Sequence, residues 1–170
     1  LVGVYEWWIP SCGSPTWQSV PWYPGDTALK NLRFWYRRGI RYMCYETYGF
    51  EKNPDPYPLR WPLRYVGACG LWNPKVKARQ VMSEACRKLY GPAAGPMLGF
   101  YQTLEQAAMD CKAKGYNWAL PAADTVYPPP VQTKASEYLQ EALKAAHDPA
   151  IVDRVRDEIA MWEEARKAMA

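Results

Sequence analysis

The chain has 170 residues, a formal net charge of +4 and a hydrophobic content of 49%. This length suits one domain with a sizeable core. Nucleic-acid interfaces cluster their cations, whereas the longest cationic run here is Arg37-Arg38, so we expect no nucleic-acid partner. Aromatic residues are abundant, with nine Trp and thirteen Tyr. Most of the Trp fall in the first 72 residues, which predicts a region that uses flat apolar faces with polar edges.

Several classes of site are not predicted by the residues present. Five cysteines lie far apart without a C-x-x-C pair, and the one histidine, His147, precedes Asp148-Pro149 at an expected helix end. No glycine-rich phosphate-binding motif occurs. The uncharged stretch from Trp7 to Gly25 contains four prolines, so a membrane span is not expected either. We therefore expect no cofactor and no metal. Any catalysis would depend on the carboxyl groups of acidic side chains.

The first 62 residues have the pattern of two strands joined by a helix. Leu1–Trp8 is rich in β-branched and aromatic residues and predicts a buried strand. The proline-rich stretch Ile9–Gly25 predicts a long irregular loop, and Asp26–Arg38 predicts a helix capped by Asp26 and ended by Gly39. Ile40–Glu46 predicts the second strand. This spacing is typical of parallel strands with a crossover helix.

The rest of the chain has helical periodicity, interrupted by proline-rich stretches. Gly49–Pro62 holds four prolines and predicts a second loop, and Tyr116–Pro130 predicts a stiff extended linker. Apolar residues recur three and four positions apart between these stretches and after them. The helices expected are Leu63–Trp72, one that begins at Pro74 and ends at Tyr90, one lined by Met97, Tyr101, Leu104, Ala108 and Cys111, one lined by Ala135, Tyr138, Leu139, Ala142 and Ala146, and one lined by Val152, Val155, Ile159 and Trp162.

We therefore predict a mostly helical fold with an α/β remnant, the βαβ unit. The expected segments are 1–62 with the two strands and the Trp-rich loop, 63–115 with helices, 116–130 as the linker, and 131–170 as a helical hairpin. The overlapping Gly91-x-x-x-Gly95-x-x-x-Gly99 pattern predicts close helix contact in this fold.

Two glutamates, Glu6 and Glu46, end the two expected strands among aromatic residues. In parallel α/β folds ligands bind outside the carboxyl ends of the strands, so we expect both side chains to face one cleft. There one carboxyl would donate a proton to a glycosidic oxygen, and the other would act as nucleophile or base. Arg41 would keep one of them ionised. The alternative is that each glutamate only binds sugar hydroxyls or neutralises an arginine.

Aromatic side chains near the same edge are candidates for stacking on sugar rings. The alternative for the four Trp is a hydrophobic cap on the end of the sheet. Together with Arg41, the expected substrate-binding residues are Trp7, Trp8, Trp17, Trp22, Tyr45 and Tyr48.

Four segments carry a resemblance to a known family. They are Tyr45-Glu46-Thr47-Tyr48-Gly49, Leu63-Arg64-Tyr65-Val66, Leu71-Trp72-Asn73-Pro74 and Leu89-Tyr90-Gly91-Pro92-Ala93-Ala94. The chain resembles, over about residues 1 to 165, the C-terminal part of bacterial glycoside-hydrolase-like proteins that carry a domain of unknown function after an alpha-glucuronidase-like N-terminal module.

The resemblance implies a (β/α) barrel whose last strands are Leu1–Trp8 and Ile40–Glu46, followed by a helical C-terminal region. It implies polysaccharide breakdown, with Glu46 and Glu6 at the sugar site, and an extracellular or periplasmic location. A whole barrel needs about 250 residues, so it further implies the N-terminal part of the same enzyme as a partner.

The leading hypothesis is therefore the C-terminal portion of a glycoside hydrolase that acts on a polysaccharide or oligosaccharide. Two other classes stay open. One is a carbohydrate-binding module without catalysis, in which no second carboxylate lies within about 5 to 10 Å of Glu46. The other is a helical protein-interaction scaffold, in which the apolar stripes of the last two helices contact a partner.

Overall fold

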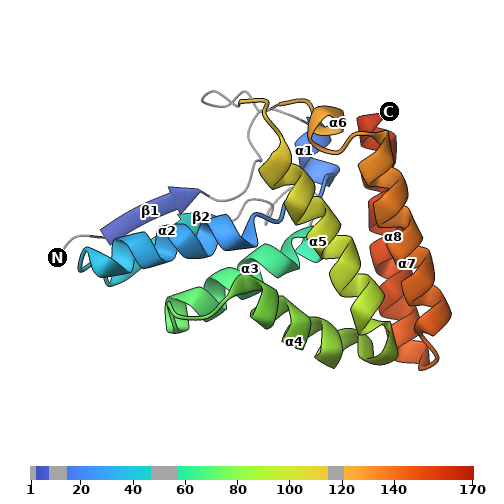
Figure 1. Cartoon of the computed structure of the whole chain (residues 1–170), viewed down its shortest axis with the longest axis horizontal. Helices are drawn as coiled ribbons and strands as arrows, with labels where there is room; N and C mark the ends of the chain where they lie inside the picture. Colours follow the sequence, from blue (N-terminus) through green and yellow to red (C-terminus); the bar gives the residue numbers. More distant parts are fainter. Residues whose placement is uncertain (1–2, 8–14, 47–56, 115–120) are drawn as a thin grey trace.

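The computed structural model describes residues 3–7, 15–46, 57–114 and 121–170, and in these the chain is mostly helical (Figure 1). The prediction of a mostly helical fold with a small strand unit is confirmed. The elements are β1 (Gly3–Trp7), α1 (Pro15–Ser19), α2 (Gly25–Arg37), β2 (Tyr42–Glu46), α3 (Tyr57–Trp72), α4 (Ala78–Tyr90), the 3-10 turn η1 (Gly91–Ala93), α5 (Ala94–Asp110), α6 (Ala123–Val126), α7 (Pro129–Ala145) and α8 (Pro149–Met169).

The strand, helix, strand unit forms as the spacing predicts. β1 and β2 pair in parallel, with α2 between them in the sequence. The helix α2 ends at Arg37. Two residues later, Gly39 adopts a φ of 84°, a left-handed conformation that glycine reaches without steric cost and that commonly follows a helix end. The expected cap by Asp26 is wrong: α2 begins at Gly25, so Asp26 lies within its first turn, and the Asp26 backbone N–H donates to Glu105 Oε1 of α5 at 2.9 Å.

One hydrophobic core extends through the helices, from Trp17 in α1 to Met169 in α8. α5 runs through the middle of the molecule, between the α2–β1–β2 side and the α7–α8 pair (Figure 1). It contributes Met97, Phe100 and Leu104, each at most 1% exposed, to this core. Since α5 packs against both α4 and α7, the core joins the central helices to the C-terminal pair.

Three proline-rich stretches are more regular than the sequence predicts. α1 forms inside the expected loop Ile9–Gly25, and α3 begins at Tyr57 rather than Leu63 and holds Pro62 within it. In the expected linker, Tyr127 is buried and donates through its hydroxyl to the carbonyl of Pro21 at 3.0 Å, while Pro129 begins α7. Proline is compatible with a first helical turn, where no N–H is needed, so these stretches contribute to the core rather than spacing it apart.

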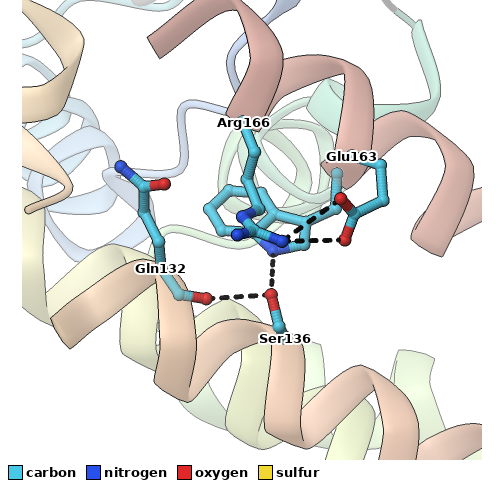
Figure 2. Close-up of polar contacts among 5 residues, drawn as sticks. Gln132, Ser136, Glu163 and Arg166 are labelled. Carbon is cyan, nitrogen blue, oxygen red and sulfur yellow. Dashed lines mark hydrogen bonds and ion pairs between the residues drawn. The ribbon is translucent and has the colours of Figure 1, made fainter. Parts of the chain in front are cut away.

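The last two helices form the predicted hairpin. Asp148 Oδ1 accepts from the N–H groups of Ala150 and Ile151 at 2.8 and 3.3 Å, the N-cap that the Asp-Pro pair predicts. Within the hairpin, Trp162 Nε1 donates to Ser136 Oγ at 2.9 Å, and Ser136 donates to the carbonyl of Gln132 (Figure 2). Arg166 binds Glu163 beside this contact (Figure 2).

The predicted close helix contact occurs at Gly99. A Cβ added there would lie 2.6 Å from Tyr138 Cε1 of α7, whereas one added at Gly95 of the same helix would meet nothing within 4 Å. The two glycines of α5 therefore differ in function: Gly99 allows α7 to approach closely, and Gly95 only lowers helix propensity.

We expect the substitution Gly99→Ala to lower the free energy of unfolding by about 1–3 kcal/mol, because the new methyl group overpacks the α5–α7 contact. The matched substitution Gly95→Ala should raise it by up to about 1 kcal/mol through helix propensity. Urea denaturation of both variants and the parent measures this. A gain in stability from Gly99→Ala would show that the contact is looser than the structure has it.

Candidate functional site

The two predicted catalytic residues lie on the paired strands, where only their backbone positions are described. The ladder pairs Glu6 with Tyr45 and Trp7 with Glu46, so both acidic positions are at the carboxyl ends of β1 and β2. This is the edge at which parallel α/β folds bind ligands. The prediction that the two strands are parallel, and so end at one edge, is confirmed.

The register does not favour one shared cleft for the two acids. Successive positions of a strand alternate between the two faces of a sheet. Positions 6 and 45 share one rung of the ladder, and positions 7 and 46 share the next. The backbone therefore assigns Glu6 and Glu46 to adjacent rungs on opposite faces of the ribbon. The individual roles of both glutamates stay predictions.

Two of the expected sugar-stacking residues are part of the core. Trp17 is 2% exposed, and its indole N–H donates to the carbonyl of Pro121 at 2.8 Å. Trp22 is half-buried, with its ring edge-on to that of Trp17 at a centroid distance of 5.4 Å. A buried indole cannot offer a face to a sugar, and Trp17 belongs to the hydrophobic core of the described residues.

The other predicted binding residues are described only in part. Arg41 is exposed, and its guanidinium donates to the carbonyls of Tyr36 and Ile40 at 2.9 Å and lies over the ring of Tyr36. It thereby closes the turn after α2. Trp8 and Tyr48 lie outside the described residues, and Trp7 and Tyr45 are placed by their backbone alone.

A site that the sequence analysis missed lies around Glu158 of α8. Its side chain is 4% exposed, which makes it the one buried acid or base of the described residues. Three donors converge on Oε1: the Tyr101 hydroxyl at 2.7 Å, the Tyr90 hydroxyl at 2.9 Å and the Trp61 indole N–H at 3.1 Å. Glu158 thus links α8 to α5, α4 and α3. We call Trp61, Tyr90, Tyr101 and Glu158 the Glu158 cluster.

Burial controls the protonation of this cluster. It raises the pKa of Glu158, and the hydrogen bonds from Tyr101, Trp61 and Tyr90 oppose that rise without cancelling it. Burial together with the charge of Glu158 also raises the pKa of Tyr101 and of Tyr90. Burial and the charge of Glu158 also raise the pKa of the Cys86 thiol, to about 12. The phenols and the thiol therefore stay neutral at ordinary pH, and Glu158 is the group of the cluster that titrates.

The second carboxyl oxygen, Oε2, is buried and has no hydrogen-bond partner in the described part of the chain. If Glu158 is ionised, Oε2 is a buried acceptor without a hydrogen bond. If Glu158 is protonated, the proton is on Oε2, because Oε1 already accepts three hydrogen bonds, and this O–H is a donor without an acceptor. Either state is costly inside a protein. The arrangement can therefore hold a proton, or accept a hydrogen bond or positive charge from outside.

A sequence signal for this site exists. The buried residues of α8 recur at alternating intervals of three and four, and Glu158 occupies one of these core positions. A carboxylate inside an otherwise apolar stripe indicates a buried partner network. The predicted stripe contains the buried Val155 and Trp162, but it includes the half-buried Val152 and Ile159 and omits Glu158.

Two further searches of the described residues concern other classes of site. Within residues 3–7, 15–46, 57–114 and 121–170, no three potential metal-ligating side chains come together. No helix of these segments has both the length and the apolar character needed to cross a lipid bilayer.

The sequence matches no protein-family model, and searches of curated proteins and of solved structures return no match. The resemblance to glycoside-hydrolase-like proteins therefore stays a prediction that rests on the four segments that carry it.

We expect Tyr101→Phe to lower the free energy of unfolding by about 1–3 kcal/mol, because Glu158 would stay buried without its shortest hydrogen bond. Tyr23→Phe is a matched control: Tyr23 is also buried, and its hydroxyl has no partner in the described residues. Its loss should be neutral or stabilising. Chemical denaturation measures both variants, and equal losses would contradict the assigned role of the Tyr101 hydroxyl.

The stability of the protein should also depend on pH through Glu158. Folding raises the pKa of Glu158 above its ordinary value of 4.5. The contribution of this shift to the free energy of unfolding is therefore complete below pH 4.5 and is lost as the pH rises through the pKa of the folded protein. The difference in unfolding free energy between the parent and Glu158→Gln should therefore fall from pH 4 upward. Urea denaturation across pH 4 to 8 measures it. Glu164→Gln, the same substitution at an exposed position of α8, is the control variant.

Proposed function

We propose that this chain is the C-terminal part of a carbohydrate-active glycoside hydrolase, in which Glu46 supplies acid chemistry at the end of β2. One observation carries the proposal: β1 and β2 are parallel and end together at Trp7 and Glu46. A carboxylate at the carboxyl end of a parallel strand occupies the position from which α/β enzymes act on their substrates.

The exposure of the two strands supports the proposal that another segment completes the sheet. Parallel sheets are usually covered on both faces, yet Tyr5 of β1 is 62% exposed and Tyr42 of β2 is 60% exposed. The sheet has only these two strands in the described residues. In the proposed enzyme, strands from the N-terminal part pair with the free edges and cover these rings.

The ends of the neighbouring helices extend the same exposed surface. Trp72, the last residue of α3, is 92% exposed, and Phe34 and Tyr36 of α2 are each more than two-fifths exposed. The guanidinium of Arg38 lies 3.6 Å from the Phe34 ring centroid. Tyr36 and Tyr42 line one pocket together with Leu71. Exposed apolar residues that lie together are typical of an interaction site, so we assign them to contact with the same N-terminal part.

A second candidate, a carbohydrate-binding module without catalysis, is favoured by the register of the ladder. Hydrolysis by two carboxylates requires both to reach one glycosidic bond, whereas Glu6 and Glu46 occupy adjacent rungs on opposite faces. In the hydrolase proposal, the second carboxylate then comes from a residue other than Glu6. In the binding-module proposal, no second catalytic carboxylate is needed.

The third class, an interaction scaffold built on the last two helices, has less support. Several of the apolar residues expected to contact a partner are packed inside the chain itself: Ala135 and Leu139 of α7 and Trp162 of α8 are each at most 1% exposed. They form the interior of the hairpin and its contact with the rest of the core.

A glycan array followed by product analysis tests the proposal on the parent chain, Glu46→Gln and Glu6→Gln. We expect glycan binding by all three and a loss of turnover of at least about 100-fold for Glu46→Gln, the usual cost of removing an acid catalyst. Glu137→Gln, an exposed position on α7, is the control and should retain full activity. Binding without turnover by the parent would favour the binding module, and no binding by any protein would reject both.

A further inference from the structure

A cleft of about 440 Å³ opens beside the Glu158 cluster, away from the strand ends. Trp61 and Tyr90 of the cluster line it together with Glu158, and Leu89, Ala160 and Met161 supply further apolar wall. Small-molecule sites have this size and this mixture of apolar walls with a few polar groups.

The charges around the cleft favour a cation. Its lining includes two acids, Asp157 and Glu158, and one cation, Arg154. The positive charge of Arg154 is directed to α4, since its guanidinium donates to the carbonyl of Leu89 at 2.8 Å. Leu89 and Tyr90 are also the last residues of α4, so the partial negative charge of a helix C-terminus lies at the same place.

The carboxyl of Glu158 has one oxygen free for a ligand. Oε1 is saturated by three donors, while Oε2 is buried without a partner in the described residues, although Glu158 lines the cleft. A buried acceptor of this kind is costly unless a donor reaches it. Because Oε2 is buried, a donor reaches it only after side chains of the cleft wall, which includes the unbranched Met161, change conformation.

We propose that the cleft beside Glu158 binds a small organic molecule with a primary ammonium group, whose N–H donates to Glu158 Oε2. The ammonium supplies the missing hydrogen bond and balances the acidic lining. The half-buried ring of Trp61 suits its charge and its alkyl chain, because aromatic rings attract cations and bury methylene groups. This site is independent of the proposed hydrolase activity, since it uses none of the residues at the strand ends.

The test is a titration of the full chain with n-butylammonium chloride, monitored by the NMR signal of the Trp61 indole N–H, which is assigned by its disappearance in Trp61→Phe. That N–H lies 3.1 Å from Glu158 Oε1 and so reports on the carboxyl. We expect saturable binding with a dissociation constant on the order of 1 mM, as small ligands allow. n-Butanol, of the same shape without the charge, should bind at least tenfold more weakly.

Three variants locate the site. Glu158→Gln should weaken n-butylammonium binding at least tenfold, and Glu164→Gln on the same helix should leave it unchanged. If Glu158→Gln does not fold, Ala160→Phe provides the same test, because it adds a ring to the cleft from an exposed position of α8 and leaves the carboxyl group in place. Equal binding of butanol and butylammonium, binding unaffected by Ala160→Phe, or no saturable shift of the Trp61 signal would each overturn the proposal.

The same titration with N-acetyl-lysine methylamide distinguishes two sources of the ammonium. Tighter binding of this compound than of n-butylammonium would identify a lysine side chain of a peptide as the natural ligand. Tighter binding of n-butylammonium would identify a free small amine.

Discussion

The helical body of this protein depends on one buried carboxyl group. Glu158 of α8 receives hydrogen bonds from α3, α4 and α5 on a single oxygen, so four helices meet at one atom. Apolar packing is tolerant of small shifts, whereas these three bonds, at 2.7 to 3.1 Å, require Trp61, Tyr90 and Tyr101 to be in fixed positions. The core supplies most of the stabilisation, and we interpret the Glu158 cluster as the feature that specifies how the helices are arranged.

A second constraint separates this body from the strand side of the molecule. The body has a solvent-excluded interior, in which Val155, Phe100 and Trp162 are inaccessible to solvent. The strands and the ends of α2 and α3 keep large aromatic rings exposed. Exposed aromatic rings are a common feature of interaction sites, and the hydrolase proposal assigns these rings to contact with further polypeptide. The hydrolase proposal and the ammonium-site proposal concern these two different parts.

Much of the local structure follows from the sequence. Gly39 predicts the end of α2, Asp148-Pro149 predicts the start of α8, and the three-and-four periodicity predicts α4, α5 and α7 within a few residues. The parallel pairing of β1 and β2 follows from the length of the segment between them. These features depend on residues close together in the chain, and local chemistry decides them.

Only the tertiary structure decided the rest, because it depends on residues that are distant in the sequence. The N-terminus of α2 is capped by Glu105, which lies 79 positions after the N–H that it accepts, and the indole of Trp17 finds its acceptor at Pro121. The register that places Glu6 and Glu46 on adjacent rungs is a one-residue choice, and the two strands lack the alternation of apolar and polar residues that would fix it. The sequence by itself determined where helices and strands form. Whether an acid or a Trp is buried depends on which distant partners reach it, and folding alone brought Trp61, Tyr90 and Tyr101 to Glu158.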